Sequence, residues 1–242
     1  MRVAVVSDIH GNRHALEAVL ADIVREAADE VWCLGDVVGY GPSPNECCAL
    51  VRERAVLALA GNHDLAVVGS LELSDFSGDA AIAARWTRDV LEPGHAEWLR
   101  SLATSGTRAG VEAYHGSPRD PVWDYVLSDE IALASLALTS SPVVLVGHSH
   151  VALAVWLNGD RLDGGQAPGE TELELAERRS LLNPGSVGQP RDGDVRAAWL
   201  MLDLDAETAS FRRTEYDVAA AQTDSRAAGL PEVLAVRLEH GI

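Results

Sequence analysis

Residues 3–12 read V-A-V-V-S-D-I-H-G-N, an apolar run that ends in an aspartate and a histidine before a Gly-Asn turn. Side chains alternate along a strand with a period of two, so Asp8 and His10 can point to the same side where the strand ends. A carboxylate oxygen beside an imidazole nitrogen suits a borderline divalent metal ion. An Asp-x-His triplet is common by chance, and this one gains weight because the pattern is repeated.

Four further apolar runs end in polar residues of the same kinds. They end at Asp36, at Asn62-His63-Asp64, at His115, and at His148 and His150. In an open α/β sheet the carboxyl ends of the strands form the ligand-binding edge, so five such strands would gather these side chains in one place. Two Asp, one Asn and several His are residue types that complete two oxygen-and-nitrogen metal shells. The sequence therefore predicts a metal centre at the strand ends.

Composition predicts one large globular domain. The chain has 242 residues, of which 47% are hydrophobic, and no shift in composition marks a second domain. We therefore expect residues 1–242 to form a single domain. The first strand begins directly after Met1-Arg2, without a secretory signal, and the apolar runs are too short to span a bilayer. This favours a cytoplasmic protein that has no membrane partner.

The charge of the chain excludes several function classes. The net charge is −18, and all 19 basic residues are arginines. Without lysine there is no P-loop lysine and no Schiff-base chemistry. An acidic chain has no broad basic surface to neutralise nucleic-acid phosphates, so no extended nucleic-acid face is expected. A small phosphoester or nucleotide held through metal ions remains compatible with this charge.

The three cysteines indicate buried, reduced thiols. Cys33 lies in a strand run, whereas Cys47 and Cys48 are adjacent in a predicted helix. Their spacing fits neither a zinc ribbon nor a disulfide framework. Reduced thiols are the usual state in a cytoplasmic protein.

The order of the elements predicts two packed sheets with helices outside. Apolar periodicity predicts helices in 12–28 and 65–102, with strands at 30–34 and 55–60. The second half is rich in strands, at 107–115, 142–146, 151–157, 195–203 and 208–216. Residues 158–170 are interpreted as a Gly-rich excursion between strands, and 181–194 as a long turn-rich loop.

Taken in order, the polar blocks resemble the motif set of the calcineurin-like metallophosphoesterase superfamily. The blocks are Asp8-x-His10, Gly35-Asp36, Gly61-Asn62-His63-Asp64, His115 and Gly147-His148-x-His150. The segment 183–188, N-P-G-S-V-G, and the segment 190–194, P-R-D-G-D, resemble a small bacterial and archaeal phosphodiesterase branch. The resemblance implies an α/β/β/α sandwich, with two packed mixed sheets flanked by helices. It also implies a di-metal site at the carboxyl ends of the strands.

The resemblance also implies a role for each block. The first metal would take Asp8, His10, Asp36 and His150, and the second Asp36, Asn62, His115 and His148. His63 would be a non-ligand histidine that assists the transition state or the leaving group. The implied cofactors are two divalent ions, with manganese as first choice and iron, zinc, nickel or magnesium as alternatives. The implied activity is hydrolysis of a phosphodiester, such as a nucleotide, by a hydroxide that bridges the two metals.

The sequence is compatible with several alternatives. Protein Ser/Thr phosphatases of this superfamily carry an Arg soon after the Gly-Asp block, where this chain has Val37–Gly41, so a phosphoprotein substrate is disfavoured. A phosphomonoesterase, a nuclease and a non-catalytic metal-binding scaffold remain alternatives, and the oligomeric state is open.

Asn12 and Arg191 are candidates for contact with the substrate. Asn12 would otherwise cap a helix, and Arg191 would otherwise pair with Asp192 or Asp194. Tyr40 would either line a pocket or pack its own loop.

Overall fold

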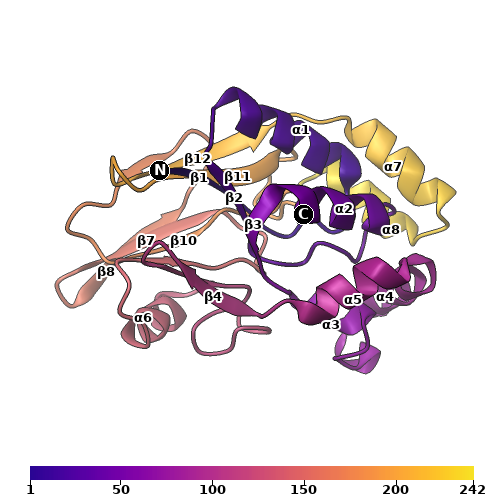
Figure 1. The fold of residues 1–242 in the computed structure, drawn as a ribbon, viewed down its shortest axis with the longest axis horizontal. Coiled ribbons are helices and arrows are strands. Elements are labelled where there is room, and N and C mark those ends of the chain that lie inside the picture. The colour runs from indigo at the N-terminus through magenta and orange to yellow at the C-terminus, as the bar shows by residue number, and fades with distance from the viewer.

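Two six-stranded sheets pack face to face in the computed structural model, which describes residues 1–242 (Figure 1). The first sheet contains β3 (Ala55–Ala58), β2 (Glu30–Cys33), β1 (Arg2–Val6), β11 (Ala197–Asp203), β12 (Thr208–Thr214) and β9 (Glu172–Glu174), in that order. The second contains β4 (Ser105–Arg108), β5 (Val111–Tyr114), β6 (Val143–Leu145), β10 (Ser180–Asn183), β7 (Leu153–Asn158) and β8 (Arg161–Gln166). Both sheets are mixed, because β1 pairs parallel with β2 and antiparallel with β11, while β10 pairs parallel with β6 and antiparallel with β7.

Helices cover the outer faces of the two sheets. They are α1 (Arg13–Arg25), α2 (Pro44–Arg54), α3 (Asn62–Val67), α4 (Gly78–Val90), α5 (Pro93–Ser101), α6 (Asp129–Ala137), α7 (Val218–Ala227) and α8 (Glu232–Val236), with 3₁₀ turns at Leu73–Asp75 and Arg237–Glu239. Figure 1 places α1 and α2 over the first sheet and α6 beneath the second. The predicted four-layer sandwich is therefore confirmed. All of these helices are too short or too polar to cross a membrane.

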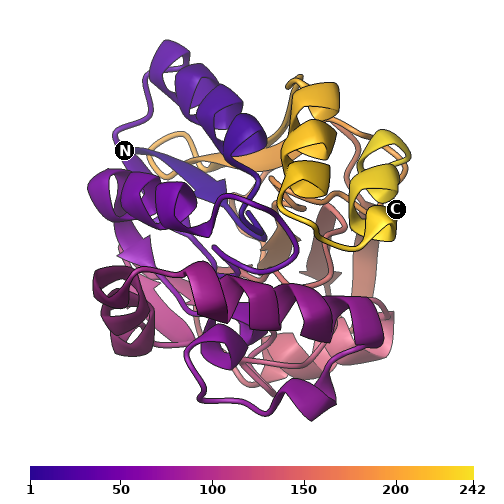
Figure 2. The ribbon, with the colours of Figure 1, turned by 90° about the vertical axis from the view of Figure 1, so that its right-hand side faces the viewer.

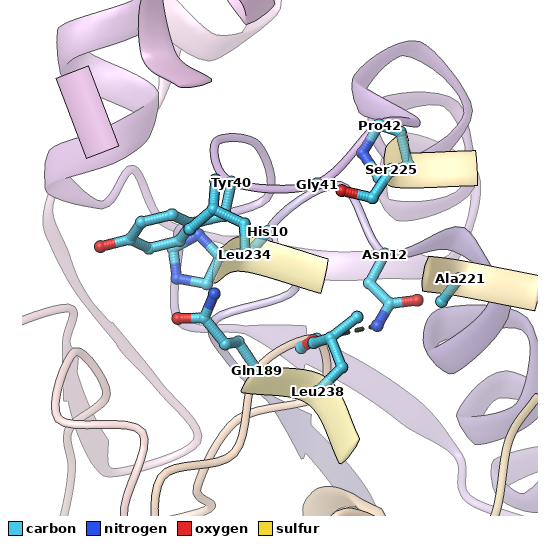
Figure 3. A pocket seen from close by; sticks show the side chains of 11 residues that line it. His10, Asn12, Tyr40, Gly41, Pro42, Gln189, Ala221, Ser225, Leu234 and Leu238 are labelled. Carbon is cyan, nitrogen blue, oxygen red and sulfur yellow. Dashed lines mark hydrogen bonds between the residues drawn. The ribbon is translucent and has the colours of Figure 1, made fainter. Parts of the chain in front are cut away.

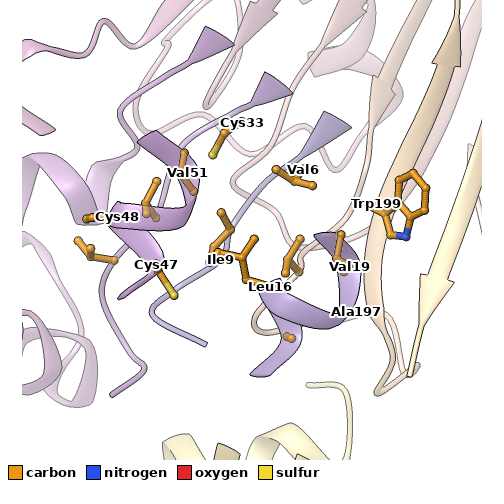
Figure 4. Close-up of a cluster of buried hydrophobic side chains, with 14 of the residues drawn as sticks. Val6, Ile9, Leu16, Val19, Cys33, Cys47, Cys48, Val51, Ala197 and Trp199 are labelled. Atoms are coloured by element: carbon orange, nitrogen blue, oxygen red, sulfur yellow. The ribbon is translucent and has the colours of Figure 1, made fainter. Parts of the chain in front are cut away.

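The alternation of side chains along β1 explains the layers. Ala4 and Val6 pack against the helices, in a cluster that includes Leu16 of α1 (Figure 4). Val3 and Val5 point the other way, into the cluster between the two sheets. A strand whose two faces are both covered reads as a continuous apolar run, which is what V-A-V-V shows.

The polar blocks lie at one edge of both sheets. β1, β2 and β3 run parallel to one another, and so do β5, β6 and β10. After β10 the chain joins the two sheet edges, because the backbone N–H of Val187 donates to Ser7 O and that of Gly188 to Asp8 O, each at 3.0 Å. In Figure 2 these strand ends are framed by α1 and α2 (indigo to purple), by α7 and α8 (yellow) and by the magenta helices α4 and α5.

Three expectations for individual elements were wrong. Residues 158–170 contain β8, which pairs along the whole of β7. β10 overlaps the start of the loop predicted at 181–194, and because all four of its residues are buried it shows no polar alternation. The helical stretch 65–102 is interrupted between α3 and α4. Short strands that are buried on both faces, or rich in glycine, carry no period-two signal.

Burial of the three thiols leads to a testable expectation. Cys33, Cys47 and Cys48 are all buried, and burial raises the pKa of each thiol. Because the thiolate is the reactive form, we expect a disulfide reagent at pH 8 to modify the native protein at least about a hundredfold more slowly than the urea-unfolded chain. A fast reaction with all three thiols of the native protein would contradict this burial.

Candidate metal centre and active site

Loops that follow parallel strands bring the seven predicted metal ligands together. Asp8 and His10 follow β1, Asp36 follows β2, and Asn62 begins α3; His115 follows β5, and His148 and His150 follow β6. The ligand atoms form two groups, and within each group all of them lie within 4.8 Å of one another. The first group contains Asp8, His10, Asp36 and His150, and the second contains Asp36, His115 and His148. Asn62 Oδ1 joins the second group at 3.2 Å from His115 Nε2. Asp36 belongs to both groups.

In the first group, two imidazole lone pairs face each other. His10 Nδ1 lies 3.2 Å from Val38 O, and His150 Nδ1 lies 2.6 Å from Gln189 O. A carbonyl oxygen only accepts, so each Nδ1 carries the proton and each Nε2 carries a lone pair. The two Nε2 atoms are 3.0 Å apart. Two ligand atoms each about 2.1 Å from one divalent ion stand roughly 3.0–3.4 Å apart, so this spacing fits a shared cation.

In the second group, His115 Nε2, Asn62 Oδ1 and Asp36 Oδ2 all face the others as acceptors. His115 Nδ1 donates to Leu34 O at 3.0 Å, so its Nε2 has no proton for Asn62 Oδ1 or for Asp36 Oδ2, which is 3.6 Å away. His148 Nδ1 lies 3.2 Å from the same Nε2. Asp8 Oδ1 and Asp36 Oδ2 are buried without a hydrogen-bond partner. Buried oxygens in this state cost free energy unless a cation balances them, so the donor set fits divalent metal ions in both groups.

Burial sets the protonation of these groups. It raises the pKa of Asp8 to about 7 and the pKa of Asp36 well above its usual range. It lowers the pKa of His148 to about 2 and those of His10 and His150 well below the ordinary value. Neutral imidazole is the metal-binding form, so at neutral pH these histidine rings need not lose a proton when a metal binds.

Five of the candidate ligands sit in the left-handed region of backbone conformation. The φ angles are 54° for Asp8, 50° for His10, 54° for Asp36, 63° for His148 and 60° for His150. Asp, Asn and His tolerate this region better than most residues, but it still costs free energy. The surrounding hydrogen bonds maintain it: Asp8 N donates to Gly35 O at 3.0 Å, and His10 N donates to Asp36 O at 2.9 Å.

Asp64 has a structural role that sequence reasoning missed. Its carboxylate accepts from the backbone N–H groups of Gly61, Val37 and Val38, at 3.0–3.2 Å. It therefore joins the loop after β2 to the start of α3, beside Asp36 and Asn62. The sequence signal was an acidic residue three positions after the residue that precedes the helix, which is typical of a capping box.

His63 lies beside the two groups and belongs to neither. It is 4% exposed, and its backbone N–H donates to Asp36 Oδ1 at 2.9 Å. Its ring packs 4.4 Å from the ring of Tyr40, and its Nδ1 is buried without a partner. Burial, followed by the charge of Arg191, lowers its pKa to about 3.

Arg191 lies at the site without a carboxylate partner. Its backbone N–H donates to His150 O at 3.1 Å, and its side chain donates to Gln189 Oε1 at 2.8 Å. The carboxylates that sequence reasoning offered as partners are engaged elsewhere: Asp192 pairs with Arg213, and Asp194 with Arg196. The guanidinium carbon is 5.8 Å from the centre of the Tyr40 ring.

Asn12 and Tyr40 line a narrow crevice beside His10 (Figure 3). The crevice runs between the loops after β2 and β10 and the C-terminal helices α7 and α8. Asn12 caps α1, because its Oδ1 accepts from Ala15 N at 3.1 Å, and its Nδ2 donates to Gly188 O at 2.9 Å. Tyr40 contacts the rings of both His10 and His63. Contact of Asn12 with substrate stays a prediction.

Three further aromatic residues lie at the site, and sequence reasoning gave them no role. The ring of Tyr125 stacks on His148, with centroids 4.0 Å apart and planes at 19°. The ring of Phe76 lies 5.0 Å from His63 and 5.3 Å from Trp123. These residues belong to loops between α3 and α4 and between β5 and α6, and no sequence period marks such positions.

Comparisons with known proteins show the family to which this chain belongs. A crystal structure of a metallophosphoesterase from Sphaerobacter thermophilus superposes with a TM-score of 0.90 and 39% identity, over 100% of both chains. An uncharacterized protein of Methanocaldococcus jannaschii is 36% identical over 98% of this chain and 96% of its own. Phosphodiesterase YfcE of Escherichia coli (strain K12) is 27% identical over 85% of this chain and 89% of its own. The family model for the calcineurin-like phosphoesterase superfamily domain matches residues 1–207. This chain is therefore a member of the calcineurin-like phosphoesterase superfamily.

Proposed function

We propose that the protein is a phosphodiesterase that uses two divalent metal ions, with manganese as first choice, and acts on a small phosphoester such as a nucleotide. The observation that carries the proposal is the pair of acceptor groups that share Asp36, in which the Nε2 lone pairs of His10 and His150 face each other at 3.0 Å. Metal ions bound there would supply an activated water and neutralise phosphoryl oxygens at neutral pH. Because the chain belongs to this superfamily, the general reaction in the proposal is hydrolysis of a phosphoric ester.

The residues around the two groups have distinct tasks in this proposal. Backbone carbonyls fix the tautomers of His10, His115 and His150, so that Nε2 of each ring is free to bind a metal. Arg191 supplies a positive charge for a phosphate oxygen, and its lack of a carboxylate partner supports this assignment. His63 lies beside Asp36, where its neutral ring would donate a hydrogen bond to the phosphoryl group in the transition state; it would protonate the leaving oxygen only if the negative charge of bound phosphate raised its pKa.

The test of this function is a screen of metals against substrates. Metal-stripped protein receives each divalent ion in turn and is assayed on p-nitrophenyl phosphate and on bis-p-nitrophenyl phosphate. The proposal expects turnover of the diester to exceed that of the monoester with Mn²⁺ or a similar ion. A preference for the monoester would make the protein a phosphomonoesterase, and no turnover of either ester despite bound metal would favour a scaffold.

The variant His63→Ala is expected to lower kcat for the diester by about a hundredfold or more, because removing one hydrogen-bond donor to the transition state has an effect of this size. Metal content should be unchanged, since His63 belongs to neither ligand group. The measurement is steady-state kinetics together with elemental analysis of the purified variant. His95→Ala is the matched control, because His95 lies in α5, outside the site. Wild-type kcat in His63→Ala would remove His63 from the mechanism.

A further inference from the structure

Three aromatic residues from two loops lie together beside the candidate metal centre. Phe, Trp and Tyr make up 5% of the sequence. Trp32, Trp199 and Phe211 are fully buried in the cores. Phe76, Trp123 and Tyr125 instead lie beside the metal centre and keep part of their rings in solvent; Tyr125 is 41% exposed. Three aromatic residues that stay partly exposed beside one site indicate a surface for a flat apolar ligand.

Tyr125 and Phe76 each contact a histidine of the site, and Trp123 is connected to the site through Phe76. Tyr125 stacks on the candidate ligand His148 at 4.0 Å and presents its exposed surface to solvent. Phe76 contacts His63 at 5.0 Å and Trp123 at 5.3 Å. A ligand stacked on these rings would therefore lie next to the place where His63 and the candidate ligands would hold a phosphate.

The loop that carries Trp123 and Tyr125 is built to hold them in place. Asp120 Oδ1 accepts from the backbone N–H groups of Val122 and Trp123, at 3.0 and 3.1 Å. Ser117 Oγ donates to Asp124 Oδ2 at 2.6 Å. A Cβ on Gly116 would lie 2.5 Å from Asp120 O, so the turn at that position is compact. A preorganised aromatic surface loses little entropy when a ligand stacks on it.

We propose that Phe76, Trp123 and Tyr125 form a stacking platform for the base of a nucleoside phosphate, so that the enzyme selects nucleotides among small phosphoesters. A nucleobase is flat and uncharged at neutral pH. Stacking it on these rings therefore brings no further negative charge to a chain of net charge −18. Stacking on aromatic side chains tolerates any base, because every base has a π-face. The platform deepens the proposed function, since the phosphate is assumed to bind at the metal centre.

The test compares two ligands that differ only in the base. Isothermal titration of the manganese-loaded protein measures the affinities of AMP and of ribose 5-phosphate. We expect AMP to bind about tenfold tighter or more, because stacking on one aromatic side chain has an effect of this order. Trp123→Ala and Tyr125→Ala should each weaken AMP binding severalfold and leave ribose 5-phosphate binding unchanged, whereas Trp123→Phe should retain the preference.

Trp156→Ala is the matched control, because Trp156 is a partly exposed aromatic residue of β7 that packs against Arg178 outside the site. It should keep the wild-type preference for AMP. Equal or undetectable binding of the two ligands to the wild type would overturn the platform, and so would a wild-type preference in both alanine variants. Tyr125→Ala keeps the test open if Trp123→Ala fails to fold, because the Tyr125 side chain is largely outside the core. A preference for AMP without turnover in the metal screen would leave the platform standing and reject the proposed function.

Discussion

Asp36→Asn is expected to lower hydrolysis of the diester by more than about a thousandfold, because it removes a charge from the one residue that both ligand groups share. Asp36 Oδ2 lies 3.5 Å from His10 Nε2 and 3.6 Å from His115 Nε2. An amide nitrogen at this position carries two hydrogens and cannot ligate a metal. The amide would be held in this orientation, because the backbone N–H of His63 donates to Oδ1 at 2.9 Å and needs an oxygen there, which leaves the amide nitrogen at the position of Oδ2.

Metal content is the second measurement on this variant. Elemental analysis should find that Asp36→Asn retains less metal than the wild type in both groups, since each loses the same carboxylate oxygen. Asp224→Asn serves as the control, because Asp224 is a half-exposed carboxylate that pairs with His14 on the surface. Full occupancy of both positions in Asp36→Asn would contradict the shared role of this carboxylate.

Removal of the metal is expected to lower the midpoint of thermal unfolding by about 10 °C. A ligand at a thousand times its Kd stabilises the native state by about 4 kcal/mol, and about 1 kcal/mol shifts the midpoint of a chain of this size by roughly 2–4 °C. The site has the features that such a gain requires: buried oxygens of Asp8 and Asp36 without partners, and ligands from both sheets. A bound metal would therefore hold the edges of the two sheets together.

Differential scanning calorimetry of the chelator-treated protein, before and after addition of Mn²⁺, measures this shift. Asp36→Asn should gain much less from Mn²⁺ than the wild type, which separates site binding from a general effect of the salt. Identical midpoints with and without Mn²⁺ would show that the two groups bind no metal tightly.

The fold and the candidate ligands could be predicted because they depend on short-range pattern. Each ligand block follows an apolar run, and parallel strands place all such ends at one edge. The strand Ser180–Asn183 was missed because both of its faces are buried. Asp64 was noticed only as a neighbour of His63, because its bonds to Val37 and Val38 join segments far apart in sequence. Phe76 and Trp123 likewise meet only when two loops are brought together by the fold.

The left-handed backbone at five candidate ligands has a consequence for how this sequence changes over time. Glycine adopts that conformation without steric cost, so the backbone at His148 and His150 carries a strain that glycine would not have. The proposed metal binding would account for imidazoles at positions where glycine would relax the backbone. Activity and backbone stability therefore place opposite demands on these positions. Mutations that stabilise the cores far from the site would increase the number of site variants that still fold.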